Sequence, residues 1–165
     1  METIKAFSLA KHEGLYETWP RRTRLYFNGG DTGSEIPGYI VEGQYRCSDG
    51  YLLITSHDCP FEESNDFLLL GDDFQILART QLAVPYGSFL LNAHWPVSSH
   101  SLRLHYYERL FFTLSVENRS GLFRSRPRLV LKPFDEPEND AAASASIAEL
   151  QRRLGEIAKY HNESN

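Results

Sequence analysis

Short runs rich in apolar, aromatic and β-branched residues recur about every ten residues along the chain, and turn-forming residues interrupt them. Runs of this length and spacing are typical of the strands of an antiparallel sandwich or barrel. The runs that we interpret as strands are residues 4–9, 23–28, 39–46, 51–56, 67–70, 74–81, 88–95, 102–107, 110–117 and 128–131. We therefore predict a mainly β protein, an antiparallel β-sandwich or open barrel of about 8–10 short strands.

Two hairpins are predicted from their turn residues. Residues 48–50 (Ser-Asp-Gly) and 71–73 (Gly-Asp-Asp) each separate two strand-like runs. Glycine adopts positive φ without strain and Asp bonds nearby backbone, so both segments favour tight turns. In residues 88–95, alternation places Leu91, Ala93 and Trp95 on the predicted core face and His94 on the opposite face.

The amino-acid composition changes after Lys132. Residues 133–141 are acidic and contain two prolines, which indicates a linker. Residues 142–161 are predicted to form an amphipathic helix, whose apolar residues Ile147, Leu150, Leu154 and Ile157 share one side. We expect residues 1–132 to form the β domain and the helix to dock on it. The alternative is that these four residues pair with a second copy, because the seam is too short for an isolated coiled coil.

Length and composition indicate the size of the domain and the cellular location. A chain of 165 residues with 41% hydrophobic residues can bury the core of one domain. No apolar run approaches the length of a membrane span, and the N-terminus lacks the features of a signal peptide. With only two cysteines, no disulfide scaffold is indicated. We therefore expect a cytoplasmic protein without a membrane segment.

Charge is unevenly distributed. Residues 31–73 contain ten Asp or Glu and one Arg, whereas residues 103–128 contain six Arg and two Glu. An acidic surface repels nucleic acid and attracts a basic protein. The arginine-rich stretch 119–128 lacks an accompanying RNA-binding signature, so we expect it to be an exposed loop before a strand. The residues predicted to bind a basic partner are Asp58, Glu62, Glu63, Asp66, Asp72 and Asp73.

His57 and Cys59 follow the strand-like run 51–56 and define an alternative, reactive site. A histidine can activate a thiol, and both residue types bind metals. However, no further ligand pair such as CxxC or HxxxH completes a metal set; His94 and His105 would have to be brought in by the fold. We therefore predict no metal and no cofactor.

Residues 31–34 (Asp-Thr-Gly-Ser) resemble the catalytic loop of aspartic proteases. That chemistry requires two such aspartates sharing a proton, and this chain has a single copy. The preceding Asn-Gly-Gly at 28–30 also departs from the family pattern. We therefore expect a flexible, glycine-rich connection here.

A non-enzymatic protein-binding module is the function that these features favour. We expect a small bacterial-type protein that masks a basic partner, as the immunity partner of a toxin does, through its acidic hairpins. The alternatives are a small hydrolase or metal-dependent enzyme centred on His57 and Cys59, and an assembly component that oligomerises through the C-terminal helix.

Overall fold

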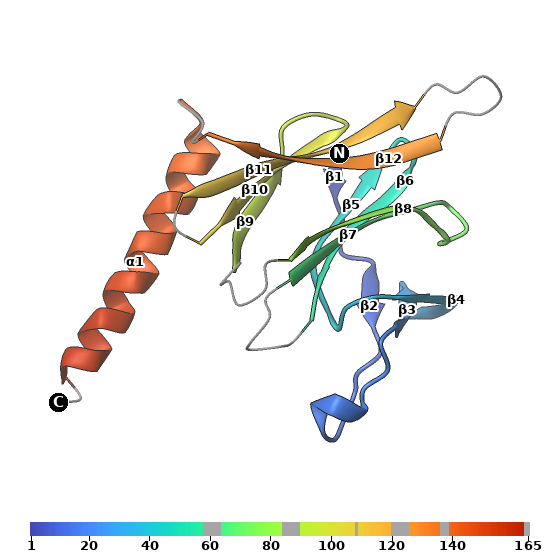
Figure 1. Ribbon diagram of the computed structural model, residues 1–165, viewed down its shortest axis with the longest axis horizontal. Helices are drawn as coiled ribbons and strands as arrows, with labels where there is room; N and C mark the ends of the chain where they lie inside the picture. The colour runs from blue at the N-terminus through green and yellow to red at the C-terminus, as the bar shows by residue number, and fades with distance from the viewer. Residues whose placement is uncertain (58–63, 84–89, 108, 120–125, 136–138, 164–165) are drawn as a thin grey trace.

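The computed structural model describes residues 1–57, 64–83, 90–107, 109–119, 126–135 and 139–163, and these form three antiparallel sheets and one α-helix (Figure 1). The central sheet has the order β1 (Glu2–Thr3), β5 (Ile40–Cys47), β6 (Gly50–Ser56), β7 (Ser64–Leu70) and β8 (Ile76–Ala83). The four-stranded sheet has the order β12 (Arg126–Phe134), β11 (Leu110–Arg119), β10 (Ser101–Tyr106) and β9 (Leu91–Pro96). The three-stranded sheet comprises β2 (Phe7–Leu9), β3 (Thr23–Phe27) and β4 (Gly30–Ile36). The predicted antiparallel β-sandwich with one C-terminal helix is confirmed.

The central sheet is buried on both faces. One face contributes Leu52, Ile54, Phe67 and Leu69 to the core shared with the four-stranded sheet, which includes Leu102, Leu104 and Leu114. The other face contributes Leu53, Leu68 and Leu70 to a second core with Phe7, Leu25 and Ile36 of the three-stranded sheet. A strand buried on both faces needs apolar residues at successive positions, which explains the continuous apolar runs of β6 and β7.

Both predicted hairpins are present. Cys47 pairs with Gly50 across the first turn, and Leu70 pairs with Ile76 across the second. Gly50 has φ 129°, and a Cβ atom at this position would lie 1.9 Å from the carbonyl oxygen of Leu70. Only glycine therefore fits where the first hairpin passes the end of β7.

The prediction of a flexible connection at residues 31–34 was wrong, because these residues lie within β4. Asn28 and Gly29 have φ values of 49° and 79°, the pattern of a type I′ turn, and Phe27 pairs with Gly30 on either side of it. Asn-Gly is the strongest short hairpin signal, so the sequence already contained the information for β4. Of the predicted strand at 4–9, only residues 7–9 form a strand, β2; β1 ends at Thr3 and joins a different sheet.

The predicted core face of β9 was right for Leu91, which packs against the core, but wrong beyond it. Tyr106 pairs with Leu91 and His105 with Ala93, so an irregularity at Asn92 interrupts the alternation. His94 consequently enters the space between the sheets and contacts Tyr45, whereas Trp95 lies opposite Arg103.

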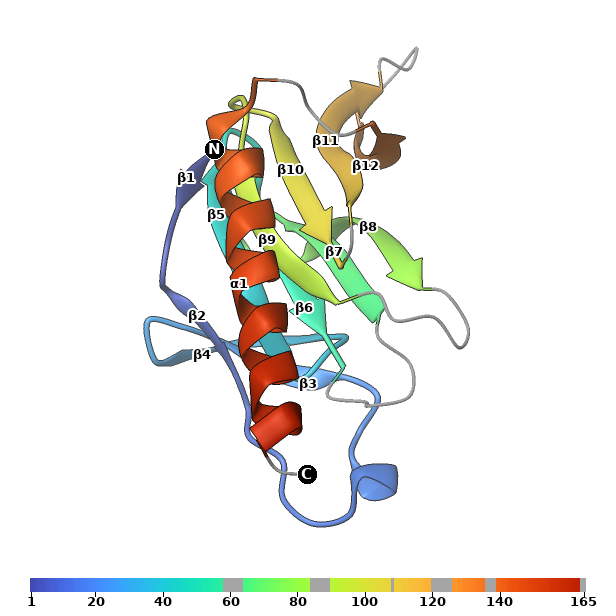
Figure 2. The ribbon, with the colours of Figure 1, turned by 90° about the vertical axis from the view of Figure 1, so that its left-hand side faces the viewer.

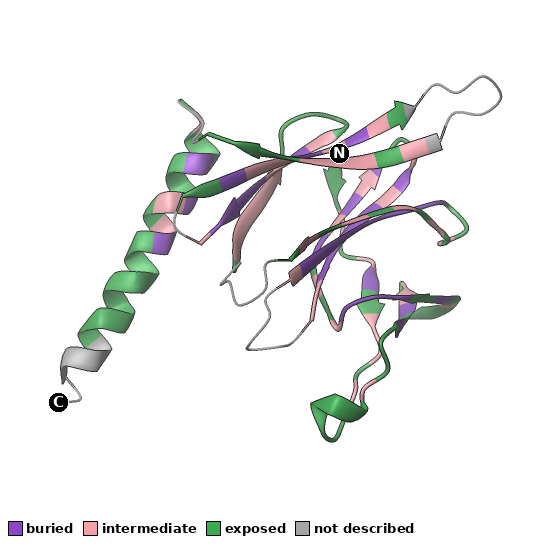
Figure 3. Cartoon of the chain, in the orientation of Figure 1, coloured by how far each residue is buried: buried purple, intermediate pink, exposed green. Residues whose placement is uncertain are grey.

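The helix α1 (Ala141–Glu163) is capped by Asp140, whose Oδ1 accepts hydrogen bonds from the amides of Ala142 (2.9 Å) and Ala143 (3.1 Å). Only its first half docks: Leu150 is 7% exposed, but Leu154 and Ile157 are 41% and 55% exposed (Figure 3). Seen from the side, the helix runs past β9 (Figure 2). Among the described residues, no helix combines the length and apolarity needed to cross a membrane.

Candidate functional site

Two of the residues predicted to bind a basic partner, Asp72 and Asp73, lie in the β7–β8 hairpin. Asp72 has a 77% exposed side chain, and its Oδ1 accepts a hydrogen bond from Nη1 of Arg46 at 2.6 Å. Asp73 is exposed, and its Oδ1 accepts a hydrogen bond from the amide of Gln75 at 3.1 Å. This hairpin therefore exposes two carboxylates to solvent. Arg46 pairs with the carboxylate of Asp72. The predicted contacts Asp58, Glu62 and Glu63 lie outside the described residues.

Phe74 anchors this hairpin to the core. Its φ of 60° lies in the left-handed region, which a bulky side chain rarely adopts. The ring packs 5.1 Å from that of Phe27 and 5.9 Å from those of Phe7 and Tyr51. Aromatic packing therefore holds a strained turn in place, and the adjacent Asp72 and Asp73 are presented on a fixed backbone.

Asp66 does not belong to the acidic surface; the prediction that it lies on an exposed loop was wrong, because β7 begins at Ser64. Its side chain is 0% exposed and accepts hydrogen bonds from Arg79 Nε (2.7 Å) and His57 Nε2 (3.3 Å). Burial alone would raise the pKa of Asp66, but these hydrogen bonds hold that pKa below its ordinary value. Asp66 is therefore a buried, paired carboxylate.

His57 is partly exposed and is held by Asp66 and by the ring of Tyr39, whose centroid lies 5.4 Å away. A carboxylate that orients a histidine is one component of a nucleophilic site. The second component, Cys59, lies outside the described residues. Among the residues that are described, no group of three or more His, Cys, Asp or Glu could hold a metal ion. The reactive site at His57 and Cys59 stays a prediction.

His94 joins two sheets. Its Nε2 donates to the backbone carbonyl of Glu42 (3.0 Å), so its Nδ1 accepts from the hydroxyl of Tyr45. Burial lowers the pKa of His94. A neutral His94 thus satisfies both ring nitrogens, and these contacts give the residue a structural role.

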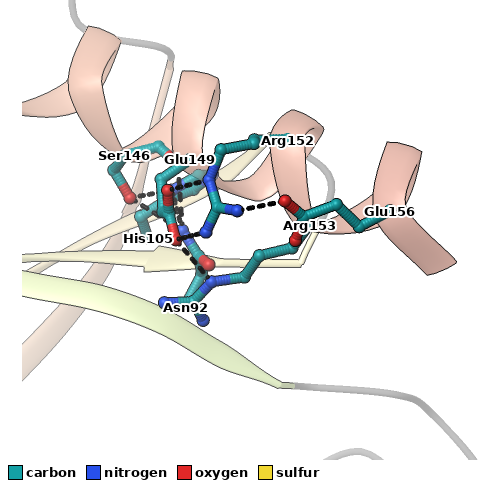
Figure 4. Close-up of polar contacts among 7 residues, drawn as sticks. All are labelled: Asn92, His105, Ser146, Glu149, Arg152, Arg153 and Glu156. Atoms are coloured by element: carbon teal, nitrogen blue, oxygen red, sulfur yellow. Dashed lines mark hydrogen bonds and ion pairs between the residues drawn. The ribbon is translucent and has the colours of Figure 1, made fainter.

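His105 and Asn92 hold the helix against the four-stranded sheet (Figure 4). Nδ1 of His105 lies 2.6 Å from Oγ of Ser146, and Nδ2 of Asn92 donates to the same Oγ at 2.8 Å. Both His105 and Ser146 are buried. We call these three residues the helix lock. Farther along the helix, Glu149 accepts hydrogen bonds from Arg152 and Arg153, which stabilise the exposed turns.

A groove lined by aromatic residues lies between β2 and the start of β5, and sequence reasoning missed it. The rings of His12, Trp19 and Tyr39 contact one another, with centroids 5.1–5.4 Å apart. Nearby, Leu15 is 73% exposed; it precedes the 3₁₀ turn Tyr16–Thr18 in the loop that protrudes below β2 and β3 in Figure 1. Sequence spacing could not have located this groove, because Tyr39 is twenty residues away from Trp19 and meets it only in the fold. The aromatic residues of the segment 12–19, which lies outside the predicted strands, were the available sequence signal.

Comparisons with protein-family models, with curated proteins and with solved structures found no match for this chain. The fold therefore defines the protein as an antiparallel β-sandwich that carries an additional small sheet and a C-terminal helix. A function has to be argued from the geometry of its exposed groups.

Proposed function

We propose that this protein is a non-enzymatic protein-binding module that binds and masks a basic partner, in the manner of a toxin-neutralising immunity protein. The observation that carries the proposal is the β7–β8 hairpin, where Asp72 and Asp73 are exposed beside the anchored, strained Phe74. Strained turns that the surrounding structure over-determines occur at binding sites more often than elsewhere.

A fixed backbone makes these carboxylates effective contacts. Ordering a loop on binding costs free energy, and a hairpin that is already ordered avoids that cost. A partner's Arg or Lys would replace Arg46 at Asp72, while Arg46 keeps its position over the ring of Tyr51, 4.5 Å from the centroid. Asp58, Glu62 and Glu63 remain proposed contacts. Asp66 is omitted because it is buried.

Charge reversal tests the proposal. The tagged wild-type chain and the Asp72→Lys/Asp73→Lys variant would be used to capture proteins from a lysate of the source cells, with identification by mass spectrometry. The control Glu13→Lys/Glu17→Lys carries the same charge change on exposed residues of a different segment. A basic protein retained by the wild type and the control, and weakened at least about tenfold by the hairpin variant, is expected. Equal retention by all three chains contradicts the proposal.

Assembly through the C-terminal helix is a second candidate, favoured by the exposure of Leu154 and Ile157. These residues continue the side of the helix that carries the buried Leu150, so a second copy could cover what the sheet does not reach. Sedimentation of the wild type and of Leu154→Lys/Ile157→Lys distinguishes the cases. A dimer that the variant dissociates supports assembly, and a monomeric wild type at high micromolar concentration excludes it.

A further inference from the structure

The groove between β2 and β5 exists because the two strands are held apart. Within the described residues, β1 pairs with β5 only at Arg46 and Tyr45, so the first residues of β5 have no strand paired on that side. Farther along, the side chain of Gln44 fills the space: its Oε1 accepts from the amides of Ala6 and Phe7, each at 2.7 Å. Beyond Gln44 the space opens into a groove of about 490 Å³. Small-molecule sites have volumes of this order.

The groove is lined mainly by apolar and aromatic groups. Its lining residues are Phe7, Ser8, Leu9, Ala10, Lys11, His12, Trp19, Tyr39, Ile40, Val41 and Gln44. The aromatic wall is fixed by polar contacts as well as by ring packing. The hydroxyl of Tyr39 donates to the carbonyl of Pro20 (3.0 Å), and Nε2 of His12 lies 3.0 Å from Oγ1 of Thr23. A rigid wall of this kind binds a flat or branched apolar group without prior rearrangement.

One polar feature of the lining indicates what else the ligand carries. Lys11 is the one permanently charged residue among the described lining residues, and no carboxylate accompanies it there. An acceptor with negative charge therefore complements the groove, whereas a cation would meet Lys11 without a counter-charge.

We propose that this groove binds a small amphipathic carboxylate. The apolar body would lie against Trp19, Tyr39 and Ile40, and the carboxylate would accept a hydrogen bond from the ammonium group of Lys11. Ile40 is 41% exposed, and such a ligand would remove part of this apolar surface from water. The site is independent of the acidic hairpin, which lies at the other end of β5.

The indole signals of the protein provide a direct test. The chain has two tryptophans, so a ¹H–¹⁵N spectrum reports on Trp19 with Trp95, on β9, as an internal control. The probes are 4-phenylbutyrate, its neutral amide and 4-phenylbutylammonium. We expect the carboxylate to shift the Trp19 signal saturably, to leave Trp95 unchanged and to bind at least about tenfold more tightly than the other two. Equal binding of the three probes, or an unmoved Trp19 signal, overturns the proposal.

Variants separate the charge from the apolar contacts. In Lys11→Met we expect the preference for the carboxylate over the amide to fall about tenfold. The matched control Lys5→Met alters an exposed lysine that does not line the groove and should keep the preference. An unchanged preference in Lys11→Met counts against the site. A short peptide ending in Phe-Gly supplies the same chemistry from a chain terminus, and tighter binding of this peptide than of 4-phenylbutyrate overturns the small-molecule assignment.

Discussion

Nε of Arg79 on β8 lies 2.7 Å from Oδ1 of Asp66 on β7, so an edge-strand guanidinium neutralises a carboxylate that solvent does not reach. The side chain of Asp66 is 0% exposed and that of Arg79 is 47% exposed. His57 contacts the other carboxylate oxygen at 3.3 Å. Water therefore reaches this group of charges at Arg79 and His57, which are both partly exposed. His57 also contacts the ring of Tyr39, which lines the aromatic groove. This group of charges therefore lies next to the groove.

Removing the carboxylate should destabilise the fold strongly. In Asp66→Ala the buried side chain and its bonds to Arg79 and His57 are lost together, and we expect the free energy of unfolding to fall by about 3 kcal/mol. The control Asp31→Ala removes an exposed ion pair with Arg24 and should destabilise the fold much less. Urea denaturation of both variants measures the difference. Equal losses would show that Asp66 contributes no more than a surface charge.

The same carboxylate should make stability depend on pH. The pKa of Asp66 is lower in the folded chain than its ordinary value of 3.8. Because the folded pKa is depressed, the contribution of Asp66 is complete above the unfolded pKa and is lost as the pH falls through the folded pKa. The wild type should therefore lose this contribution below about pH 4. Asp66→Asn should show a shallower loss over the same range in urea denaturation. Parallel pH profiles would contradict this role.

Loss of the helix lock should release α1. In Ser146→Ala, His105 and Asn92 lose the hydroxyl that both contact, although Asn92 keeps its bond to the backbone carbonyl of Ser146 (3.2 Å), and we expect a cost of about 1 kcal/mol. Hydrogen exchange of the helix amides should accelerate more than that of the central sheet. The control Ser144→Ala changes an exposed serine on the same helix and should leave exchange unchanged. Equal acceleration in both variants would mean that apolar contacts alone dock the helix.

Most of the strands were predictable from sequence because their signals are local. The turn at Asp49 and Gly50 and the alternation along β11 are examples that need no knowledge of the rest of the chain. The type I′ turn at Asn28 and Gly29 was equally local, although the prediction of a flexible connection gave it less weight than the following Asp-Thr-Gly-Ser. The burial of β6 and β7 on both faces was already visible as continuous apolar runs.

Other features could not be predicted because they depend on how distant segments meet. The irregularity at Asn92 moves His94 into the core, and no alternation rule anticipates a bulge. Asp66 was assigned to an acidic loop because its partner Arg79 lies thirteen residues away, on the neighbouring strand. The aromatic groove likewise combines residues from two sheets, so composition indicated the aromatic residues but not the surface they form.

Because Phe74 has a positive φ, the usual order of stability, in which an alanine variant exceeds a glycine variant, should be reversed at this position. Phe74→Ala and Phe74→Gly both lose the ring contacts, but only alanine retains a Cβ atom at φ 60°. Glycine adopts this conformation freely, so we expect Phe74→Gly to be more stable than Phe74→Ala by about 1 kcal/mol. Phe27 is the control: it lies within β3, where Phe27→Gly should be less stable than Phe27→Ala. Thermal denaturation of the four variants measures both orders, and the same order at both positions would show that the turn at Phe74 is unstrained.

Two glycines should respond to alanine in opposite directions. A Cβ atom on Gly43 would lie 2.7 Å from Cε1 and 3.0 Å from Nε2 of His94, so the imidazole has to move away from Glu42 and Tyr45. We expect Gly43→Ala to lower the free energy of unfolding by about 2–3 kcal/mol, because a core clash is added to lost buried hydrogen bonds. Gly155 lies inside α1, where a Cβ atom would meet no other atom within 4 Å, and alanine favours the helix. Gly155→Ala should therefore raise the free energy of unfolding by about 0.5–1 kcal/mol. Urea denaturation measures both changes; a neutral Gly43→Ala would mean that His94 does not join the two sheets.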